Sequence, residues 1–161
     1  MCLREILICI LLCLVSFCRG VFAAEFEAPA VSGAVSSFEE TGTNWMSGWY
    51  IGAEGYAKAI EEYERTDKAM AVYIDVKWCP YCRLFEKNVL STPEVREFMN
   101  DMIRVRIDPE TGTRENSIAF QYGVMGFPSF YVHPPQQGGA VRLYTGIPPG
   151  QFIELFKKAL G

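Results

Sequence analysis

The chain has 161 residues, half of them hydrophobic, and a formal net charge of -4. This length accommodates one domain with a hydrophobic core, and the charge provides no basic footprint for nucleic acid. Four of the six cysteines lie within the first eighteen residues, at Cys2, Cys9, Cys13 and Cys18. The N-terminal segment and the rest of the chain therefore need separate interpretation.

The first 23 residues have the features of a secretion signal. Arg4 gives a positively charged start, and residues 6–17 are apolar apart from Ser16. In Val21-Phe22-Ala23, Val21 and Ala23 are the small residues that a signal peptidase recognises before its cleavage site. The apolar run is shorter than the roughly 20 residues of a membrane span. We predict a signal peptide at 1–23 and a periplasmic or other extracytoplasmic location. An uncleaved N-terminal anchor in the inner membrane is the alternative.

Residues 24–48 are predicted to form a linker or disordered arm, because they are rich in small residues, Glu and Pro and show little periodicity. Trp45, Trp49 and Tyr50 lie at its end. We expect these aromatic residues to dock the arm on a domain that occupies residues 49–161. A surface that binds a partner is the alternative.

The domain alternates between helical and strand patterns. Helices are predicted where apolar residues recur with a helical period, and strands where they run together or alternate with polar residues. Thr92 is expected to cap a helix that restarts at Pro93. In chain order the prediction is a helix at 54–65, a buried strand at 69–76, a helix at 80–90, the restarted helix, a strand at 103–107, a turn at 108–112, a helix at 115–122, a hairpin of strands at 129–133 and 140–145, and a helix at 149–160.

A Trp-Cys-Pro-Tyr-Cys motif at 78–82 stands between the first strand and the second helix. The spacing lets both sulfurs meet in one small ring, and Cys79 falls at the helix start, where free N–H groups and the helix dipole favour a thiolate. The alternatives are a zinc site or a pair of core thiols. Zinc takes about four ligands, yet the chain has no second Cys-x-x-Cys and its only histidine is His133. We interpret the motif as a redox site that needs no metal or other cofactor.

The order of elements resembles the thioredoxin superfamily, with Cys-x-x-Cys after the first strand and a proline, Pro128, 49 residues after Cys79. The likeness extends to bacterial periplasmic thioredoxin-like proteins, including the C-terminal domain of the thiol:disulfide interchange protein. It implies an α/β thioredoxin-like fold with a central mixed sheet flanked by helices. The segments that carry it are Trp78-Cys79, Cys82-Arg83-Leu84-Phe85-Glu86-Lys87, Ser91-Thr92-Pro93-Glu94-Val95 and Gly126-Phe127-Pro128.

The resemblance also implies roles for individual residues. In that family the first cysteine, here Cys79, is the exposed nucleophile, and the second, here Cys82, resolves the mixed disulfide. The matching proline is cis and lies beside the disulfide, which leaves the backbone before it free to pair with a substrate peptide. The implied substrate-binding residues are Trp78, Pro80, Tyr81, Phe127 and Pro128.

Two features depart from the thioredoxin pattern. Thioredoxins usually carry a buried acidic residue six positions before the first cysteine, where this chain has Tyr73. Asp75, Lys77 and Glu86 are candidates to tune the thiol pKa instead; Asp75 and Lys77 share the strand parity of Tyr73, and Glu86 matches an acidic position near the site of the interchange protein and lies one helical turn past Cys82. Solvent-facing Lys77 and Glu86 are the alternatives. The second departure is the Pro-Tyr pair between the cysteines, which resembles glutaredoxins.

The preferred hypothesis is an envelope thiol-disulfide oxidoreductase that reduces protein disulfides. Its partners would be protein thiols and disulfides, together with a membrane electron donor. The alternatives are an oxidase or isomerase of disulfides, a non-catalytic binding module, and a carrier of a soft metal such as copper(I). His133, next to two prolines at a strand end, is expected to lie away from the site.

Overall fold

The computed structural model describes residues 44–136 and 139–161. The signal peptide predicted at 1–23 lies outside these residues, as does all of the predicted arm before Asn44. In the described part of the chain, no helix has both the length and the apolar character needed to cross a membrane.

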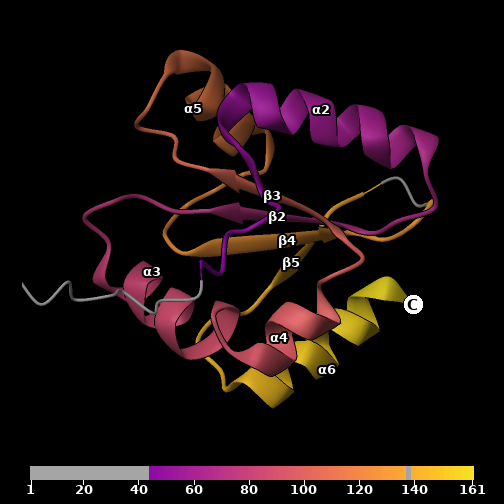
Figure 1. Ribbon diagram of the computed structural model, residues 1–161. Helices are drawn as coiled ribbons and strands as arrows, with labels where there is room; N and C mark the ends of the chain where they lie inside the picture. Colours follow the sequence, from indigo (N-terminus) through magenta and orange to yellow (C-terminus); the bar gives the residue numbers. More distant parts are fainter. Residues whose placement is uncertain (1–43, 137–138) are drawn as a thin grey trace, which may run out of the picture. The chain divides into compact units, whose positions relative to one another are not determined.

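A mixed sheet of five strands forms the centre of the domain (Figure 1). The strands lie in the order β1-β3-β2-β4-β5; the first three in this order are parallel, and β4 and β5 join antiparallel. Their bounds are β1 Tyr50–Ile51, β2 Met70–Ile74, β3 Ile103–Ile107, β4 Ser129–His133 and β5 Val141–Leu143. Every residue of β2 is buried, as expected for a continuous apolar run in a strand covered on both faces.

Helices cover both faces of this sheet (Figure 1). One layer consists of α2 (Gly52–Arg65) and α5 (Thr113–Gln121), which bury Ala59 and Ile118 with the apolar side chains of β3. The other layer contains α3 (Pro80–Phe85), a π-helical turn η1 (Glu86–Leu90), α4 (Pro93–Phe98) and α6 (Pro149–Leu160).

Phenylalanine rings hold α3 and α6 against β4. The ring centroid of Phe130 lies 6.0 Å from Phe85, 5.2 Å from Phe152 and 5.9 Å from Phe156. All four side chains are buried, and edge-to-face aromatic pairs at such distances add to the stabilisation from buried area. This packing holds the C-terminal end of α3, at Phe85, against β4 and α6.

The tryptophans before β1 pack onto the domain, in agreement with the docking prediction. The Trp45 and Trp49 rings meet edge to face at 5.3 Å, and their centroids lie 6.2 Å and 6.5 Å from the ring of Tyr73. Tyr50 belongs to β1, a two-residue strand that the sequence patterns did not predict. The segment from Asn44 to Trp49 therefore covers the sheet beside α3.

Three predicted local features need correction. The helix predicted at 80–90 divides into α3 and η1, because the turn that begins at Glu86 is π-helical. Thr92 precedes α4 but does not cap it; its hydroxyl donates to the Val89 carbonyl at 2.8 Å. This bond satisfies an acceptor at the end of η1, a common use of a threonine hydroxyl. The final strand spans three residues rather than six.

Candidate active site

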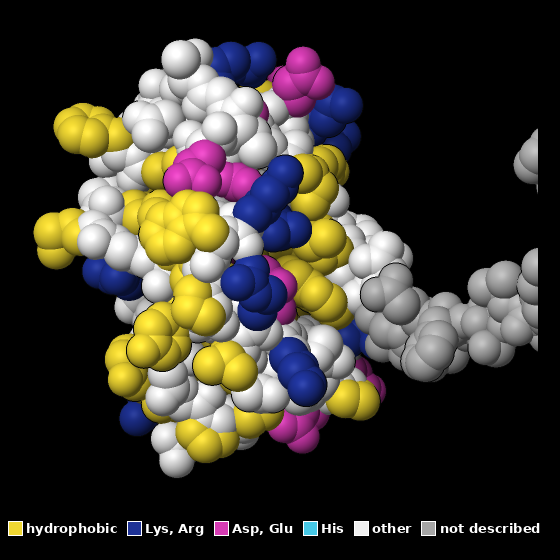
Figure 2. Space-filling view, turned by 90° about the vertical axis from the view of Figure 1, so that its left-hand side faces the viewer, with side chains coloured by type: hydrophobic (Ala, Val, Ile, Leu, Met, Phe, Trp, Pro, Cys, Tyr) yellow, Lys and Arg dark blue, Asp and Glu magenta, His cyan; other side chains and the backbone are white. Residues whose placement is uncertain are grey.

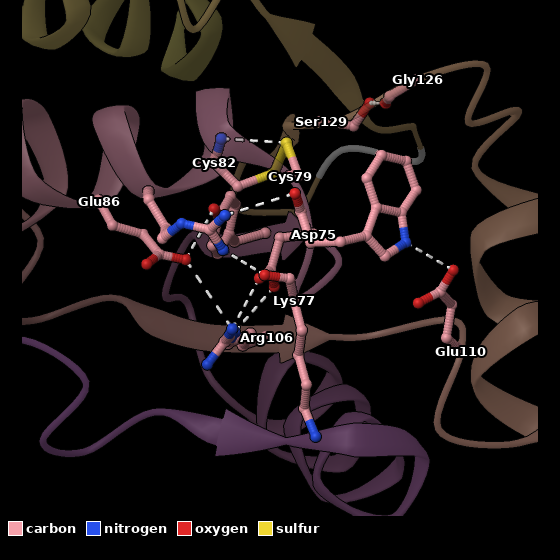
Figure 3. The surroundings of a disulfide bond; sticks show 12 residues. Asp75, Lys77, Cys79, Cys82, Glu86, Arg106, Glu110, Gly126 and Ser129 are labelled. Carbon is pink, nitrogen blue, oxygen red and sulfur yellow. Dashed lines mark hydrogen bonds and ion pairs between the residues drawn. A yellow bond between two sulfur atoms is a disulfide. The ribbon is translucent and has the colours of Figure 1, made fainter.

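Cys79 and Cys82 lie where the chain leaves β2 and enters α3, and they form a disulfide (Figure 3). Cys79 is the N-cap of α3, and Pro80 takes the first helical position, where a missing N–H costs nothing. The N–H of Cys82 donates to the Cys79 sulfur at 3.1 Å. The sulfur of Cys79 thus accepts a backbone donor that the helix start leaves free.

The disulfide is buried, with Cys79 3% and Cys82 1% exposed. This differs from the exposed position that the resemblance implied for Cys79. The reason is that Val76 and Phe127 pack against the two cysteines. Position relative to the helix, rather than exposure, therefore distinguishes the two sulfurs in the disulfide form.

Trp78 and Phe127 flank the disulfide. The Trp78 side chain is 63% exposed, and its indole N–H donates to Glu110 at 2.9 Å. Its ring meets that of Phe127 edge to face, with centroids 6.4 Å apart. The Phe127–Pro128 peptide bond is cis, as predicted. The fold places the Gly-Phe-Pro loop beside the cysteines although Gly126, its first residue, comes 44 positions after Cys82 in the sequence.

A groove of about 1010 Å³ runs from this loop between α3 and the segment that joins β5 to α6. Three of the five predicted substrate-binding residues line it: Tyr81, Phe127 and Pro128. Trp78 and Pro80 do not line it but lie exposed beside the disulfide.

Figure 2, viewed from the side of the molecule where β2 ends, shows hydrophobic side chains gathered on this face next to a row of Lys and Arg side chains. The other apolar or aromatic residues that line the groove include Leu84, Tyr144, Ile147, Pro148 and Pro149.

A network of charged side chains lies behind the disulfide (Figure 3). Asp75 is 1% exposed and accepts two hydrogen bonds from Arg106, at 2.7 Å from Nε and 2.6 Å from Nη2. The same Nη2 lies 3.8 Å from Glu86 Oε1, and the Tyr73 hydroxyl donates to that oxygen at 3.1 Å. Met46 closes the network, since its sulfur lies 3.2 Å from Arg106 Nη1.

Residues 49–135 match the family model described as thioredoxin-like. The chain belongs to the thioredoxin-like family. The matched region runs from the residue before β1 to just past β4, so it includes both cysteines, the charge network from Asp75 to Arg106, and Pro128.

Solved structures show the same fold. A DsbH oxidoreductase has a TM-score of 0.58 at 21% identity, over 65% of this chain and 81% of its own. A thioredoxin from Thermus thermophilus has a TM-score of 0.58 at 23% identity, over 69% and 86%. The oxidised C-terminal domain of Neisseria meningitidis DsbD has a TM-score of 0.54 at 21% identity, over 66% and 93%. A search of curated proteins finds no match.

The charge network differs from the thioredoxin pattern at its centre. Tyr73 occupies the position where thioredoxins usually have the buried acid, and the buried acid of this thioredoxin-like chain is Asp75, two residues later. Burial raises the pKa of the Tyr73 hydroxyl strongly, so this group stays protonated and donates to Glu86. Burial also raises the pKa of Glu86, with a further rise from the Asp75 carboxylate, whereas the hydrogen bond from Tyr73 and the cations of Arg106 and Arg83 oppose this rise. Hydrogen bonding to Asp75 raises the pKa of Arg106, which remains a cation.

The three candidates for pKa tuning therefore fall into two groups. Asp75 and Glu86 both contact Arg106 in the network. Lys77 is exposed, and Figure 3 shows its side chain directed away from the sulfurs. The backbone carbonyl of Lys77 accepts a hydrogen bond from Arg83, which also bonds the Trp78 carbonyl at 3.4 Å. Arg83 thus fastens the loop before Cys79 to the first turn of α3.

His133 lies at the opposite end of the sheet from the disulfide. It pairs with Met70 at the start of β2, whereas the cysteines follow the end of that strand. Its Nε2 lies 2.6 Å from the Tyr122 hydroxyl, and burial lowers its pKa. The expectation that His133 stands away from the site agrees with this geometry.

Arg106 is the main residue of the site that the sequence patterns missed. The alternation of β3 suggested only a strand with one polar face, yet Arg106 lies beside Tyr73 in the parallel register of β2 and β3. A cation on a strand covered by helices needs an acidic partner. That argument could have identified Arg106 as a candidate from the sequence. The identity of the partner depends on the strand register, which a single sequence does not contain.

Proposed function

We propose that this chain is an envelope thiol-disulfide oxidoreductase that reduces protein disulfides. The observation that carries the proposal is the Cys79–Cys82 disulfide at the start of α3, beside the Phe127–Pro128 loop and the groove. The groove offers apolar surface for a client segment, and the Cys-x-x-Cys pair supplies the chemistry.

The proposed reaction has two exchange steps. The Cys79 thiolate attacks one sulfur of the client disulfide, breaks the S–S bond and releases one client thiolate. Cys82 then loses its proton and attacks the Cys79 sulfur, which forms the internal disulfide and releases the second client thiolate. The two client thiolates take up protons. The client therefore gains two electrons and two protons, and the cysteine pair loses them.

The direction of electron flow follows from how well the site stabilises a thiolate. A strong oxidant stabilises its reduced form with positive charge and hydrogen-bond donors. Here Pro80 has no N–H to offer the Cys79 sulfur, and Lys77 is exposed. Asp75 and Glu86 bring two carboxylates to the neighbouring network, in which Arg106 contacts both and Arg83 also acts on Glu86. Nearby negative charge disfavours a thiolate, so these carboxylates, together with the missing Pro80 donor, support a reductant.

We expect the Cys79–Cys82 couple to have a reduction potential of roughly -200 to -270 mV, in the range of thioredoxins and glutaredoxins. Equilibration of the chain in glutathione or dithiothreitol buffers, followed by tryptophan fluorescence or thiol alkylation, measures it. The Cys79→Ser/Cys82→Ser double variant should show no transition in the same buffers.

The redox state in cells provides a second readout of this potential. A reductant should be trapped mostly as the dithiol, because a membrane electron donor of the dithiol class would return the electrons. Mispaired envelope disulfides and the haem-attachment thiols of c-type cytochromes are the clients we propose. An oxidised pair at steady state, with a potential near roughly -120 mV, would instead make the chain an oxidase. Binding of clients without any turnover would make it a binding module.

We also propose that residues 1–30 export the chain. The proposal rests on Arg4, the apolar run at 6–17 and the small residues at Val21 and Ala23. A fusion of residues 1–30 to a reporter that is active only outside the cytoplasm should be active. The same fusion with Leu12→Arg should be inactive, because a charge interrupts the apolar run. An inactive unmodified fusion, beside a working exported control, would remove this proposal.

A further inference from the structure

A smaller pocket lies between α4, β3 and the segment that precedes β1. Its volume is about 370 Å³, within the size range of pockets that bind small molecules. Arg96 of α4 and Arg104 of β3 line it, together with Trp45 and Ser47 from the segment before β1. None of the described residues that line this pocket also lines the groove beside the disulfide. The pocket is therefore separate from the proposed exchange site.

The two arginines of this pocket lack an acidic partner. Neither guanidinium makes a hydrogen bond or an ion pair with another residue of 44–136 or 139–161. Arg104 is partly buried, and its Nε is a buried donor without an acceptor in the described part of the chain. Burial, and then the neighbouring Arg96 cation, lower the pKa of Arg104. Two positive charges thus stand close together with no compensating carboxylate.

Arg106 shows what the same strand does with a cation whose partner is built in. Arg104 and Arg106 lie on the same face of β3, because side chains alternate along a strand, and both are partly buried. Arg106 is paired with Asp75 through two hydrogen bonds. A buried cation costs free energy unless it is paired, and an unsatisfied buried donor in a native protein calls for a water or an ion. Beside a second cation, an anion satisfies both the donor and the charge of Arg104.

We propose that this pocket binds a small ligand that carries a phosphate group, held between the guanidinium groups of Arg96 and Arg104. A phosphate monoester carries close to two negative charges at neutral pH, which matches two cations better than one carboxylate does. Arginine also pairs with phosphate through two parallel N–H donors. The Ser47 hydroxyl provides a further donor, and Trp45 provides an apolar surface for the rest of the ligand.

Glu97 lines the same pocket and gives the proposal a test of sign. It is exposed and makes no ion pair with either arginine within the described residues. Its carboxylate repels a phosphate group bound at the arginines, although solvent weakens this repulsion. Loss of the Glu97 charge should therefore strengthen the binding that loss of either arginine weakens.

Phenyl phosphate is the probe, because it joins a phosphate group to a flat apolar ring. Isothermal titration of the full chain should detect its binding, and the melting temperature should rise with its concentration, as for any ligand of the native state. Inorganic phosphate should bind more weakly because it lacks the ring. Phenol should not bind because it lacks the charge. Added sodium chloride should weaken the binding of phenyl phosphate by screening.

Single replacements by glutamine test the residues. Arg96→Gln and Arg104→Gln should each weaken the binding of phenyl phosphate by roughly 10- to 100-fold, the usual effect of losing hydrogen bonds to a charged group. Glu97→Gln should bind it more tightly than the native chain does. Arg114→Gln is the matched control, because it removes the same charge from an exposed residue of α5, on the opposite face of the sheet. It should bind as the native chain does, and melting of each variant without ligand reports whether it folds.

The phosphate group has two plausible sources, a soluble ester and a lipid headgroup. Co-sedimentation of the full chain with vesicles of phosphatidylcholine, with and without phosphatidic acid, separates them. For a headgroup site, phosphatidic acid should increase the bound fraction of the native chain and not that of Arg104→Gln. An equal response of the two chains, with phenyl phosphate bound in the titration, would support a soluble ester.

Three results would overturn the proposal. The first is a native chain that binds neither phenyl phosphate nor inorganic phosphate. The second is equal weakening in Arg104→Gln and Arg114→Gln, since net charge alone would then explain the binding. The third is tighter binding of benzoate than of phenyl phosphate, which would replace the phosphate group by a carboxylate. Disulfide reduction plays no part in these measurements, so this proposal and the proposed function can fail independently.

Discussion

Cys79→Ser is expected to abolish disulfide reduction, whereas Cys82→Ser is expected to accumulate mixed disulfides through Cys79. The reason is the place of each sulfur relative to α3. The Cys79 sulfur stands at the N-cap and accepts the N–H of Cys82, and a thiolate at this position is favoured by the donor and by the helix dipole. Cys82 lies inside the first turn and has no such donor among the hydrogen bonds of the described residues.

The measurement is turnover of a protein disulfide, combined with mass spectrometry of covalent complexes trapped by acid. Ser91→Ala is a suitable control, because among the described residues the Ser91 hydroxyl bonds only the Lys87 carbonyl of η1. It should reduce substrate at the native rate. The opposite pattern, with complexes trapped by Cys79→Ser and none by Cys82→Ser, would reverse the two roles.

Burial of both cysteines bears on how a client approaches. Because Val76 and Phe127 pack against the two cysteines, we expect a client of the proposed reaction to reach Cys79 past the exposed residues Trp78 and Pro80. We expect the remainder of the client segment to lie in the groove beside Tyr81. The hydrogen bond from the Trp78 indole to Glu110 holds this exposed side chain in place beside the disulfide.

The elements nearest the chemistry could be predicted from the sequence because local patterns determine them. The buried run before the motif becomes β2, the proline after Cys79 starts α3, and the last helix spans the predicted residues 149–160. The π-helical turn at Glu86–Leu90 could not be predicted, since the apolar residues recur in the same way in an α-helix. The burial of Cys79 depends on Phe127, a residue remote in sequence.

The charge network could be predicted only in part. Glu86 was a candidate because it matches an acidic position near the site of the interchange protein and lies one helical turn past Cys82, and Asp75 because it shares the strand parity of Tyr73. The contact between Asp75 and Arg106 arises from the parallel pairing of β2 with β3, where Tyr73 lies opposite Arg106. Neighbour relations across a sheet are set by the tertiary structure, so no spacing rule within one segment reveals them.

Arg106→Met is expected to destabilise the fold by about 3–5 kcal/mol, the usual cost of leaving one partner of a buried ion pair without the other. Asp75 is 1% exposed, and within the described residues both hydrogen bonds to its carboxylate come from Arg106. Removal of the guanidinium would therefore leave a desolvated carboxylate without its donors. Urea unfolding of the oxidised chain gives the free energy of unfolding.

The double variant Asp75→Asn/Arg106→Met separates the contribution of the ion pair to stability from the contribution of the packed alkyl part of Arg106. Replacement of both charges removes the unpaired carboxylate, so much of the lost stability should return, and the coupling energy of the cycle should be well above zero. Arg104→Met is the matched control: its guanidinium makes no hydrogen bond within the described residues, and its pKa is lowered by burial and by Arg96. It should cost far less than Arg106→Met. Equal losses for Arg104→Met and Arg106→Met, with no recovery in the double variant, would mean that the Asp75–Arg106 pair contributes packing alone.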